Sequence, residues 1–180
     1  MTLCLTGFMG CGKSSVGRRL SELLCCPFTD LDDVIAEKAR RSIPEIFASE
    51  GEAAFRQMEY AALEHILNIQ EIHQVLALGG GTVMTPECAK LVHEKTVCIY
   101  LRASVATLFS HLEGESEGRP VLSGINSERH DHAGESSLQS RIKDLMARRT
   151  ATYEKTAHVI IDTDGKSIEN ICNEIMKVLS

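Results

Sequence analysis

One short stretch near the start of the chain constrains the fold more than any other. Residues 7–14 read Gly-Phe-Met-Gly-Cys-Gly-Lys-Ser, which fits the spacing of glycines, lysine and serine in a P-loop. The mostly apolar residues 3–6 before it predict a short buried strand, and residues 15–24 after it carry apolar side chains at helical spacing. The glycines therefore form the turn between a strand and a helix, an arrangement typical of α/β proteins that bind nucleoside triphosphates.

The residue types in this loop suit the binding of phosphate groups. Glycines leave no side chain to hold the backbone away from an anion, and the N–H groups of the turn and of the helix N-terminus face it. Lys13 reaches the outer phosphates as a point charge, and the Ser14 hydroxyl is a ligand for the Mg²⁺ ion that bridges them. The predicted phosphate-binding residues of the loop are Gly10, Cys11, Gly12, Lys13, Ser14 and Ser15.

Length, composition and charge set outer bounds on the function. A chain of 180 residues with 43% hydrophobic residues is long enough for one globular domain, so we expect a single domain over residues 1–180. We see neither an apolar run that would cross a bilayer nor a secretion signal, and the expected location is cytoplasmic. A net charge of -6 argues against a general attraction to nucleic acid or to an anionic membrane.

The cysteines are predicted to be reduced. There are seven of them, an odd number, mostly set in apolar runs, and they include no C-x-x-C pair that would indicate a zinc or redox site. Cys11 occupies an unconstrained position of the P-loop pattern, so we interpret its side chain as filler rather than as a nucleophile.

Carboxylates follow the second predicted strand, residues 27–30. In a parallel sheet, ligands bind outside the carboxyl ends of the strands, so Asp30 and Asp32 are expected to face the P-loop. The alternative is helix capping, which Asp also favours, and we assign capping or simple solvation to Asp33.

The third predicted strand ends in three glycines. Residues 75–78 are apolar, and Gly79, Gly80 and Gly81 follow at once, which leaves bare N–H groups for a ligand to approach. Many P-loop proteins carry an Asp at the end of such a strand for the magnesium shell, but here the position is Leu78. The magnesium role therefore falls on Asp30, acting through water.

The remaining segments complete an alternating pattern. Helices are predicted over residues 34–40, from a capping box at 42–45, over 51–69, 86–93, 104–112, 138–153 and 168–179, with strands over 97–101 and 159–162. In the helix over 51–69, Arg56 and Glu59 lie off the apolar stripe. This pattern predicts a doubly wound, five-stranded parallel sheet flanked by helices. Residues 113–137 are rich in Gly, Ser, Glu and His and read as a flexible lid between the core segments 1–112 and 138–180.

Taken together, these segments resemble the shikimate kinase family across essentially the whole chain. That family has a nucleoside monophosphate kinase-like fold. The resemblance rests on six stretches in the same order, namely residues 7–17, 30–33 (Asp-Leu-Asp-Asp), 42–47 (Ser-Ile-Pro-Glu-Ile-Phe), 51–56 (Gly-Glu-Ala-Ala-Phe-Arg), 78–81 (Leu-Gly-Gly-Gly) and 118–122 (Gly-Arg-Pro-Val-Leu).

The resemblance implies ATP-dependent phosphorylation of the 3-hydroxyl of shikimate, with Mg²⁺, in the pathway to chorismate and the aromatic amino acids. It implies that Asp32 holds the attacking hydroxyl, that Arg56 and a later arginine clamp the substrate carboxylate, and that the glycines at 79–81 complete that pocket. It also implies that Arg119 descends with the lid onto the phosphates. We expect a monomer whose partners are shikimate and ATP.

The later arginine is chosen by register. The family usually shows Arg-x-Pro-x-Tyr on the helix after the lid, and here Arg149-Thr-Ala-Thr-Tyr153 matches it without the proline. Arg148 would point about 100° away around a helix of 3.6 residues per turn, so Arg149 is the predicted clamp.

Two other classes of function compete with this interpretation. Gluconate and nucleoside monophosphate kinases share the P-loop but are not expected to combine Asp32, Arg56 and the triple glycine. A GTPase switch would carry an Asn-Lys-x-Asp sequence, which does not occur here. A nucleotide-binding module without turnover is the remaining alternative.

Overall fold

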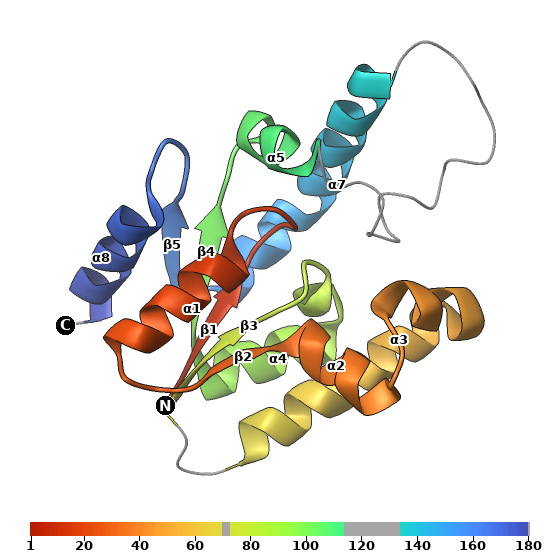
Figure 1. The fold of residues 1–180 in the computed structure, drawn as a ribbon, viewed down its shortest axis with the longest axis horizontal. Helices are drawn as coiled ribbons and strands as arrows, with labels where there is room; N and C mark the ends of the chain where they lie inside the picture. Colours follow the sequence, from red (N-terminus) through yellow and green to blue (C-terminus); the bar gives the residue numbers. More distant parts are fainter. Residues whose placement is uncertain (70–72, 114–133, 180) are drawn as a thin grey trace.

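The computed structural model describes residues 1–69, 73–113 and 134–179, which form an α/β fold around one sheet (Figure 1). Five parallel strands lie in the order β2-β3-β1-β4-β5. Their bounds are Thr2–Thr6 for β1, Phe28–Asp30 for β2, Gln74–Ala77 for β3, Thr96–Arg102 for β4 and Val159–Asp162 for β5. The P-loop strand β1 is thus central, which brings the carboxyl ends of its neighbours beside the loop.

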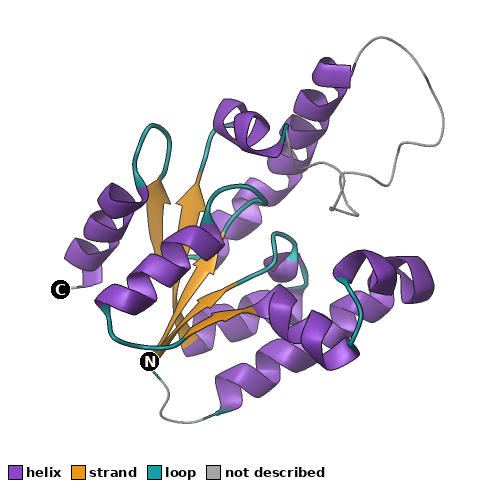
Figure 2. Ribbon diagram, viewed as in Figure 1, coloured by secondary structure: helices purple, strands orange, loops and turns teal. Residues whose placement is uncertain are grey.

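Helices cover both faces of this sheet (Figure 2), as the predicted doubly wound architecture requires. The helices α1 and α8 pack together on one face, and α4 and α7 pack on the other. Their bounds, with those of the other helices, are Lys13–Leu23 for α1, Leu31–Ala39 for α2, Ile43–Asn68 for α3, Pro86–Lys95 for α4, Val105–Leu112 for α5, Gly134–Thr156 for α7 and Ile168–Leu179 for α8, with a 3-10 turn η1 at Thr82–Met84.

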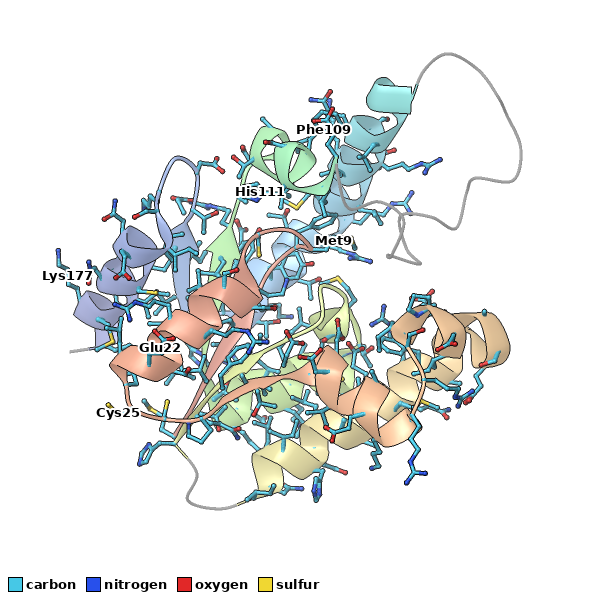
Figure 3. The ribbon with its side chains drawn as sticks, in the orientation of Figure 1. Met9, Glu22, Cys25, Phe109, His111 and Lys177 are labelled. Atoms are coloured by element: carbon cyan, nitrogen blue, oxygen red, sulfur yellow. The ribbon has the colours of Figure 1, made fainter. Side chains whose placement is uncertain are left out.

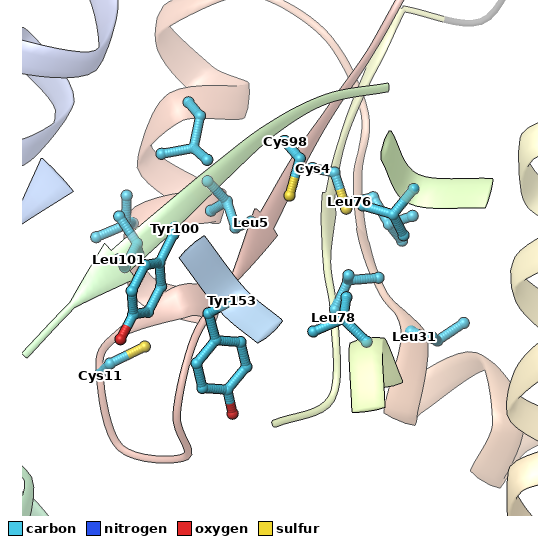
Figure 4. Packing of buried hydrophobic residues seen from close by; sticks show 14 of the residues in the cluster. Cys4, Leu5, Cys11, Leu31, Leu76, Leu78, Cys98, Tyr100, Leu101 and Tyr153 are labelled. Carbon is cyan, nitrogen blue, oxygen red and sulfur yellow. The ribbon is translucent and has the colours of Figure 1, made fainter. Parts of the chain in front are cut away.

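The core lies between the sheet and the helices (Figure 4). All residues of β1 and β3 are buried, which explains why these strands read as continuous apolar runs rather than as alternating patterns. Tyr100 of β4 stacks on Tyr153 of α7, with ring centroids 5.0 Å apart, and both are fully buried. This contact fixes α7 against β4.

The seven cysteines are free, as predicted. Five of them are buried in the core, namely Cys4, Cys11, Cys88, Cys98 and Cys172. Burial, with the neighbouring Cys98 thiol, raises the pKa of Cys4 well above its ordinary value.

Side-chain caps fix where several helices begin. The predicted capping box is present, because Ser42 accepts from the N–H of Glu45 while the Glu45 carboxylate accepts from the N–H of Ser42. Helix α2 begins at Leu31, three residues earlier than predicted, because the Asp30 carboxylate accepts from the N–H of Asp32 at 3.1 Å and caps it. Of the two readings given for Asp33, capping or solvation, the structure shows solvation: Asp33 is exposed, and Asp30 makes the cap.

Within the described residues, no helix is long and apolar enough to cross a bilayer. Most of the predicted lid, residues 114–133, lies outside the described part of the chain.

Candidate active site

A cavity of about 900 Å³ opens at the carboxyl edge of the sheet. The structure brings together around it nearly all the residues that the sequence predicts for the site, from the P-loop to α7. They are Gly10, Cys11, Gly12, Lys13, Ser14, Ser15, Asp30, Asp32, Arg56, Gly79, Gly80, Gly81 and Arg149. The remaining predicted site residue, Arg119, lies outside the described residues.

The P-loop lysine is held by its own loop. The buried Lys13 ammonium donates to the carbonyl of Gly7 at 3.0 Å and to that of Phe8 at 2.9 Å. Gly10 and Gly12 adopt φ angles of 79° and 92°, in the left-handed region that favours glycine, and α1 begins directly after Gly12. The positive end of the helix and one fixed ammonium therefore face the same part of the cavity.

A hydroxyl and a carboxylate meet beside the P-loop. The Ser14 hydroxyl donates to Asp30 Oδ2 at 2.7 Å, while Asp30 Oδ1 makes the α2 cap. Both contacts hold the carboxylate in one orientation. Mg²⁺ prefers such oxygen ligands and usually keeps several waters, so this pair fits a magnesium site with few direct protein ligands.

Asp32 lies in the cavity among other carboxylates. Burial raises its pKa from the ordinary 3.8 to about 6, and the nearby Asp30 and Glu59 add to the shift while Lys13 and Arg56 oppose it. A carboxylate with a pKa close to neutral is suited to accept a proton in catalysis.

Arg56 is fixed by a carboxylate that was not predicted as part of the site. Glu59 is fully buried, accepts from Arg56 Nη1 at 2.7 Å and from the Thr82 hydroxyl at 2.5 Å, and lines the cavity. The i,i+3 spacing of Arg56 and Glu59 is the signal that would have found the pair.

Two predicted substrate residues lie directly against the triple glycine. A β-carbon at Gly79 would lie 2.8 Å from Asp32 Oδ1, and one at Gly81 would lie 2.5 Å from Arg56 Nη2. A side chain at either position would displace Asp32 or Arg56, so the glycines allow the loop to lie directly against these predicted substrate residues.

Helix α7 contributes Arg149 to the cavity lining. Its side chain is buried, donates to the Gly80 carbonyl at 3.3 Å and lies over the Phe8 ring, whereas Arg148 is exposed. Tyr153, one turn later, donates its hydroxyl to the same Gly80 carbonyl. Arg149 therefore faces the cavity and Arg148 faces solvent, as the register set by Tyr153 predicts.

The loop after β5 also lines the cavity, through Thr163, Lys166 and Ser167. The loop is anchored to β4, because the Thr163 N–H donates to the carbonyl of Arg102 at 2.9 Å.

Comparison with known proteins gives one consistent family. A family model described as shikimate kinase matches residues 9–180. Curated shikimate kinases from Dictyoglomus turgidum and Thermus thermophilus are 35% and 38% identical to the chain, cover 99% and 97% of it, and are themselves covered to 96% and 88%.

Solved structures agree with the sequence comparison. A shikimate kinase from Acinetobacter baumannii in complex with shikimate superposes with a TM-score of 0.87 at 28% identity, over 99% of this chain and 92% of that one. A shikimate kinase from Bacteroides thetaiotaomicron gives 0.85 at 26% identity, over 99% and 98%.

Proposed function

The chain belongs to the shikimate kinase family, and we propose that it transfers the γ-phosphoryl group of ATP to the 3-hydroxyl of shikimate. The observation that carries the proposal is that Lys13, Asp32 and Arg56 line one cavity. A phosphate-binding group, a base and a carboxylate-binding group are what this transfer needs side by side.

Asp32 is proposed to orient the acceptor hydroxyl and to take its proton. The hydroxyl oxygen forms the new bond to the γ-phosphorus, the bond to the bridging oxygen of ADP breaks, and the proton passes to the Asp32 carboxylate. Only the ionised carboxylate can do this, and its raised pKa makes it a better proton acceptor than an ordinary Asp.

The P-loop is proposed to hold the phosphates. Its N–H groups and the α1 N-terminus face the anion, and Lys13 exchanges the carbonyls of Gly7 and Phe8 for phosphate oxygens. Arg119 is also proposed to bind the phosphates, and this role rests only on the resemblance of residues 118–122 to the family. The transition state of phosphoryl transfer is loose, so such fixed charges supply most of what the protein contributes.

Ser14 and Asp30 are the residues proposed to hold Mg²⁺, Asp30 through water. When bound, the ion would neutralise charge on the β- and γ-phosphates of ATP.

Arg56 and Arg149 are proposed to bind the shikimate carboxylate, with the glycines at 79–81 completing the wall. Arginine offers a planar fork of donors that matches a carboxylate, which a lysine does not. Glu59 and the Gly80 carbonyl hold the two guanidinium groups before the substrate arrives. The similar shikimate kinase from Acinetobacter baumannii, solved in complex with shikimate, supports the same acceptor.

We also propose roles for parts of the chain beyond these residues. The loop of residues 163–166 is proposed to contact the adenine of ATP. The chain is proposed to form a single domain over residues 1–180, with residues 113–137 as its lid. The chain is proposed to be a cytoplasmic monomer that binds neither nucleic acid nor membrane, on the basis of its charge and composition.

A coupled assay of ADP release tests the function. The chain is incubated with ATP and Mg²⁺ and with shikimate, gluconate or a nucleoside monophosphate as the acceptor. We expect rapid ADP release with shikimate and only the background rate with the others. Turnover with gluconate or a monophosphate in place of shikimate would refute the assignment, and ATP binding without turnover on any acceptor would favour the non-catalytic module.

A further inference from the structure

The last turn of α5 touches the P-loop through a histidine. His111 Nδ1 lies 2.8 Å from the carbonyl oxygen of Gly10, and Figure 3 shows His111 at the end of α5 that faces the loop. A carbonyl oxygen can only accept, so Nδ1 carries the proton and donates. The ring is exposed and lines the same cavity as Lys13 and Ser14.

This contact fixes one peptide group in the middle of the P-loop. The carbonyl of Gly10 and the N–H of Cys11 belong to the same planar unit. The carbonyl accepts from His111, and the N–H donates to the carbonyl of Phe8 at 3.3 Å. The peptide is therefore held at both its carbonyl and its N–H. This matters because Gly10 has a φ of 79°, and glycine has more backbone freedom than any other residue type.

The neighbouring side chain supports the same peptide by packing. A β-carbon at Gly10 would lie 2.9 Å from Leu112 Cγ, so the buried Leu112 covers the glycine directly. His111 and Leu112 thus contact the loop from one turn of one helix.

The other end of α5 is also anchored next to the cavity. The N–H of Ser104, the cap of α5, donates to Asp164 Oδ1 at 2.9 Å in the loop after β5. Helix α5 therefore spans from the proposed adenine loop to the P-loop, which gives His111 a fixed support.

We propose that His111 is a positioning residue for the nucleotide. By holding the Gly10–Cys11 peptide, it fixes the backbone that leads into Gly12, Lys13 and Ser14, which receive the phosphates. Without the ring, this peptide gains freedom that ATP must remove on binding, so nucleotide affinity falls while the acceptor site is unchanged. The inference rests on the proposed function only in taking ATP as the nucleotide.

The test compares two substitutions at one position. His111→Ala removes the donor, whereas His111→Asn keeps an amide N–H where Nδ1 stands. Because one hydrogen bond is lost, we expect the dissociation constant for ATP, measured by calorimetry without acceptor, to rise about three- to tenfold in His111→Ala. It should stay within about twofold of wild type in His111→Asn. In steady-state assays the KM for ATP should follow the same order, with the KM for shikimate unchanged.

His65→Ala is the matched control, because His65 is also exposed but lies near the end of α3 and does not line the cavity. Wild-type ATP affinity in His111→Ala would overturn the inference. His111→Gln places its amide where Nε2 stands. If His111→Gln restores ATP binding while His111→Asn binds ATP as weakly as His111→Ala, the Nδ1 contact is not the one that matters, and the inference is also overturned. A wild-type chain that binds ATP but leaves shikimate untouched would instead refute the proposed function, so the two failures are distinguishable.

Discussion

Asp32 shares its cavity with two other carboxylates, and this crowding determines how it behaves. Burial comes first among the causes that raise its pKa to about 6, and Asp30 and Glu59 add to it. Lys13 and Arg56 limit the shift, so the group titrates between an ordinary Asp and a histidine. A pKa of about 6 suits the role of proton acceptor that we propose for Asp32.

The first prediction concerns pH. Since only ionised Asp32 accepts the proton, we expect kcat/KM for shikimate to fall about tenfold per pH unit below about pH 6 and to be level from pH 7 to 8. A pH–rate profile measured at saturating ATP checks this. A profile that is level down to pH 4.5 would contradict the assignment of Asp32 as the base.

The second prediction separates the activity of Asp32 from its cost to stability. Asp32→Asn should retain ATP affinity and lose about 10²- to 10⁴-fold in kcat. Because the pKa of Asp32 is raised in the folded state, its effect on the free energy of unfolding is most favourable at low pH, where it is protonated. This contribution is lost as the pH rises through 6. Asn avoids this decline, so the variant should be more stable than wild type at pH 8, by at most about 3 kcal/mol, and less so at pH 5.

Urea unfolding at the two pH values measures this difference. Asp33→Asn is the matched control, because Asp33 is exposed in the first turn of α2 and should only lose a small favourable interaction with the helix dipole. Equal stability of Asp32→Asn and wild type at pH 8 would show that the carboxylate carries no such cost.

The third prediction concerns Glu59, the buried partner of Arg56. Glu59→Gln weakens the hold on the guanidinium, so we expect the KM for shikimate to rise about five- to fiftyfold, while the KM for ATP is unchanged. It also removes a negative charge near Asp32, so the acid limb of the pH–rate profile should move to lower pH.

The control for this variant is Glu52→Gln. Glu52 is the exposed partner of the same arginine at 3.2 Å, and such pairs contribute little in water. We expect less than about a twofold change in the KM for shikimate. An acid limb that stays in place in Glu59→Gln would show that Glu59 does not act on Asp32.

Among the elements, α3 shows how a break in a helix can serve a site. Gly51 has φ 81° and ψ 174°, so the residues before and after it form two helical segments that meet at an angle. Phe47 in the first and Phe55 in the second bring their ring centroids within 4.7 Å, and Arg56 follows Phe55 directly. The break therefore helps to place Arg56, the proposed carboxylate clamp.

The fourth prediction follows from that backbone. Gly51→Ala forces a side chain into a conformation that only glycine adopts readily, at a cost of about 1–3 kcal/mol in the free energy of unfolding. Because the bend sets the position of Arg56, the KM for shikimate should also rise. Ala61→Gly, at an exposed position in the second segment, should destabilise by about 1 kcal/mol and leave the KM unchanged. Equal KM values for the two variants would refute the link between the bend and the clamp.

The elements that the sequence predicts best are those with clear local signals. The capping box at Ser42, the strand β5 and the helix α8 fall where predicted, and the break at Gly51 divides α3 as expected. The predicted start of α2 is wrong by three residues, because the prediction treats Asp30 as a ligand and not as a cap. In the structure, one oxygen of Asp30 caps the helix and the other contacts Ser14.

Glu59 was missed for a different reason. It lies off the apolar stripe of α3, a place usually exposed to solvent. The structure shows it buried instead, with a tertiary contact to Thr82 beside its i,i+3 contact with Arg56. The 3-10 turn at Thr82–Met84 that supplies this contact carries no periodic signal of its own. Site residues that depend on another element are the hardest to find from one segment of sequence.

For the whole molecule, the fifth prediction uses the cysteines as reporters of packing. Cys25 is exposed and Cys26 is half-buried, whereas the other five thiols lie in the core. With an aromatic disulfide reagent, we expect one thiol of the native protein to react quickly and one slowly, and all seven to react after denaturation. Cys25→Ser should remove the fast phase. Reaction of three or more thiols before unfolding would show that the core is more open than described.

Placing both proposed substrates in one cavity has a pharmacological consequence. Lys13 and Arg56 lie on walls of the same 900 Å³ space, with Asp32 also lining it. A bisubstrate inhibitor, in which a tether joins a nucleoside phosphate to a small cyclic carboxylate, would need no new opening to reach both walls. Once one end is bound, the tether presents the other at high effective concentration, so such a compound should inhibit far more strongly than either half alone.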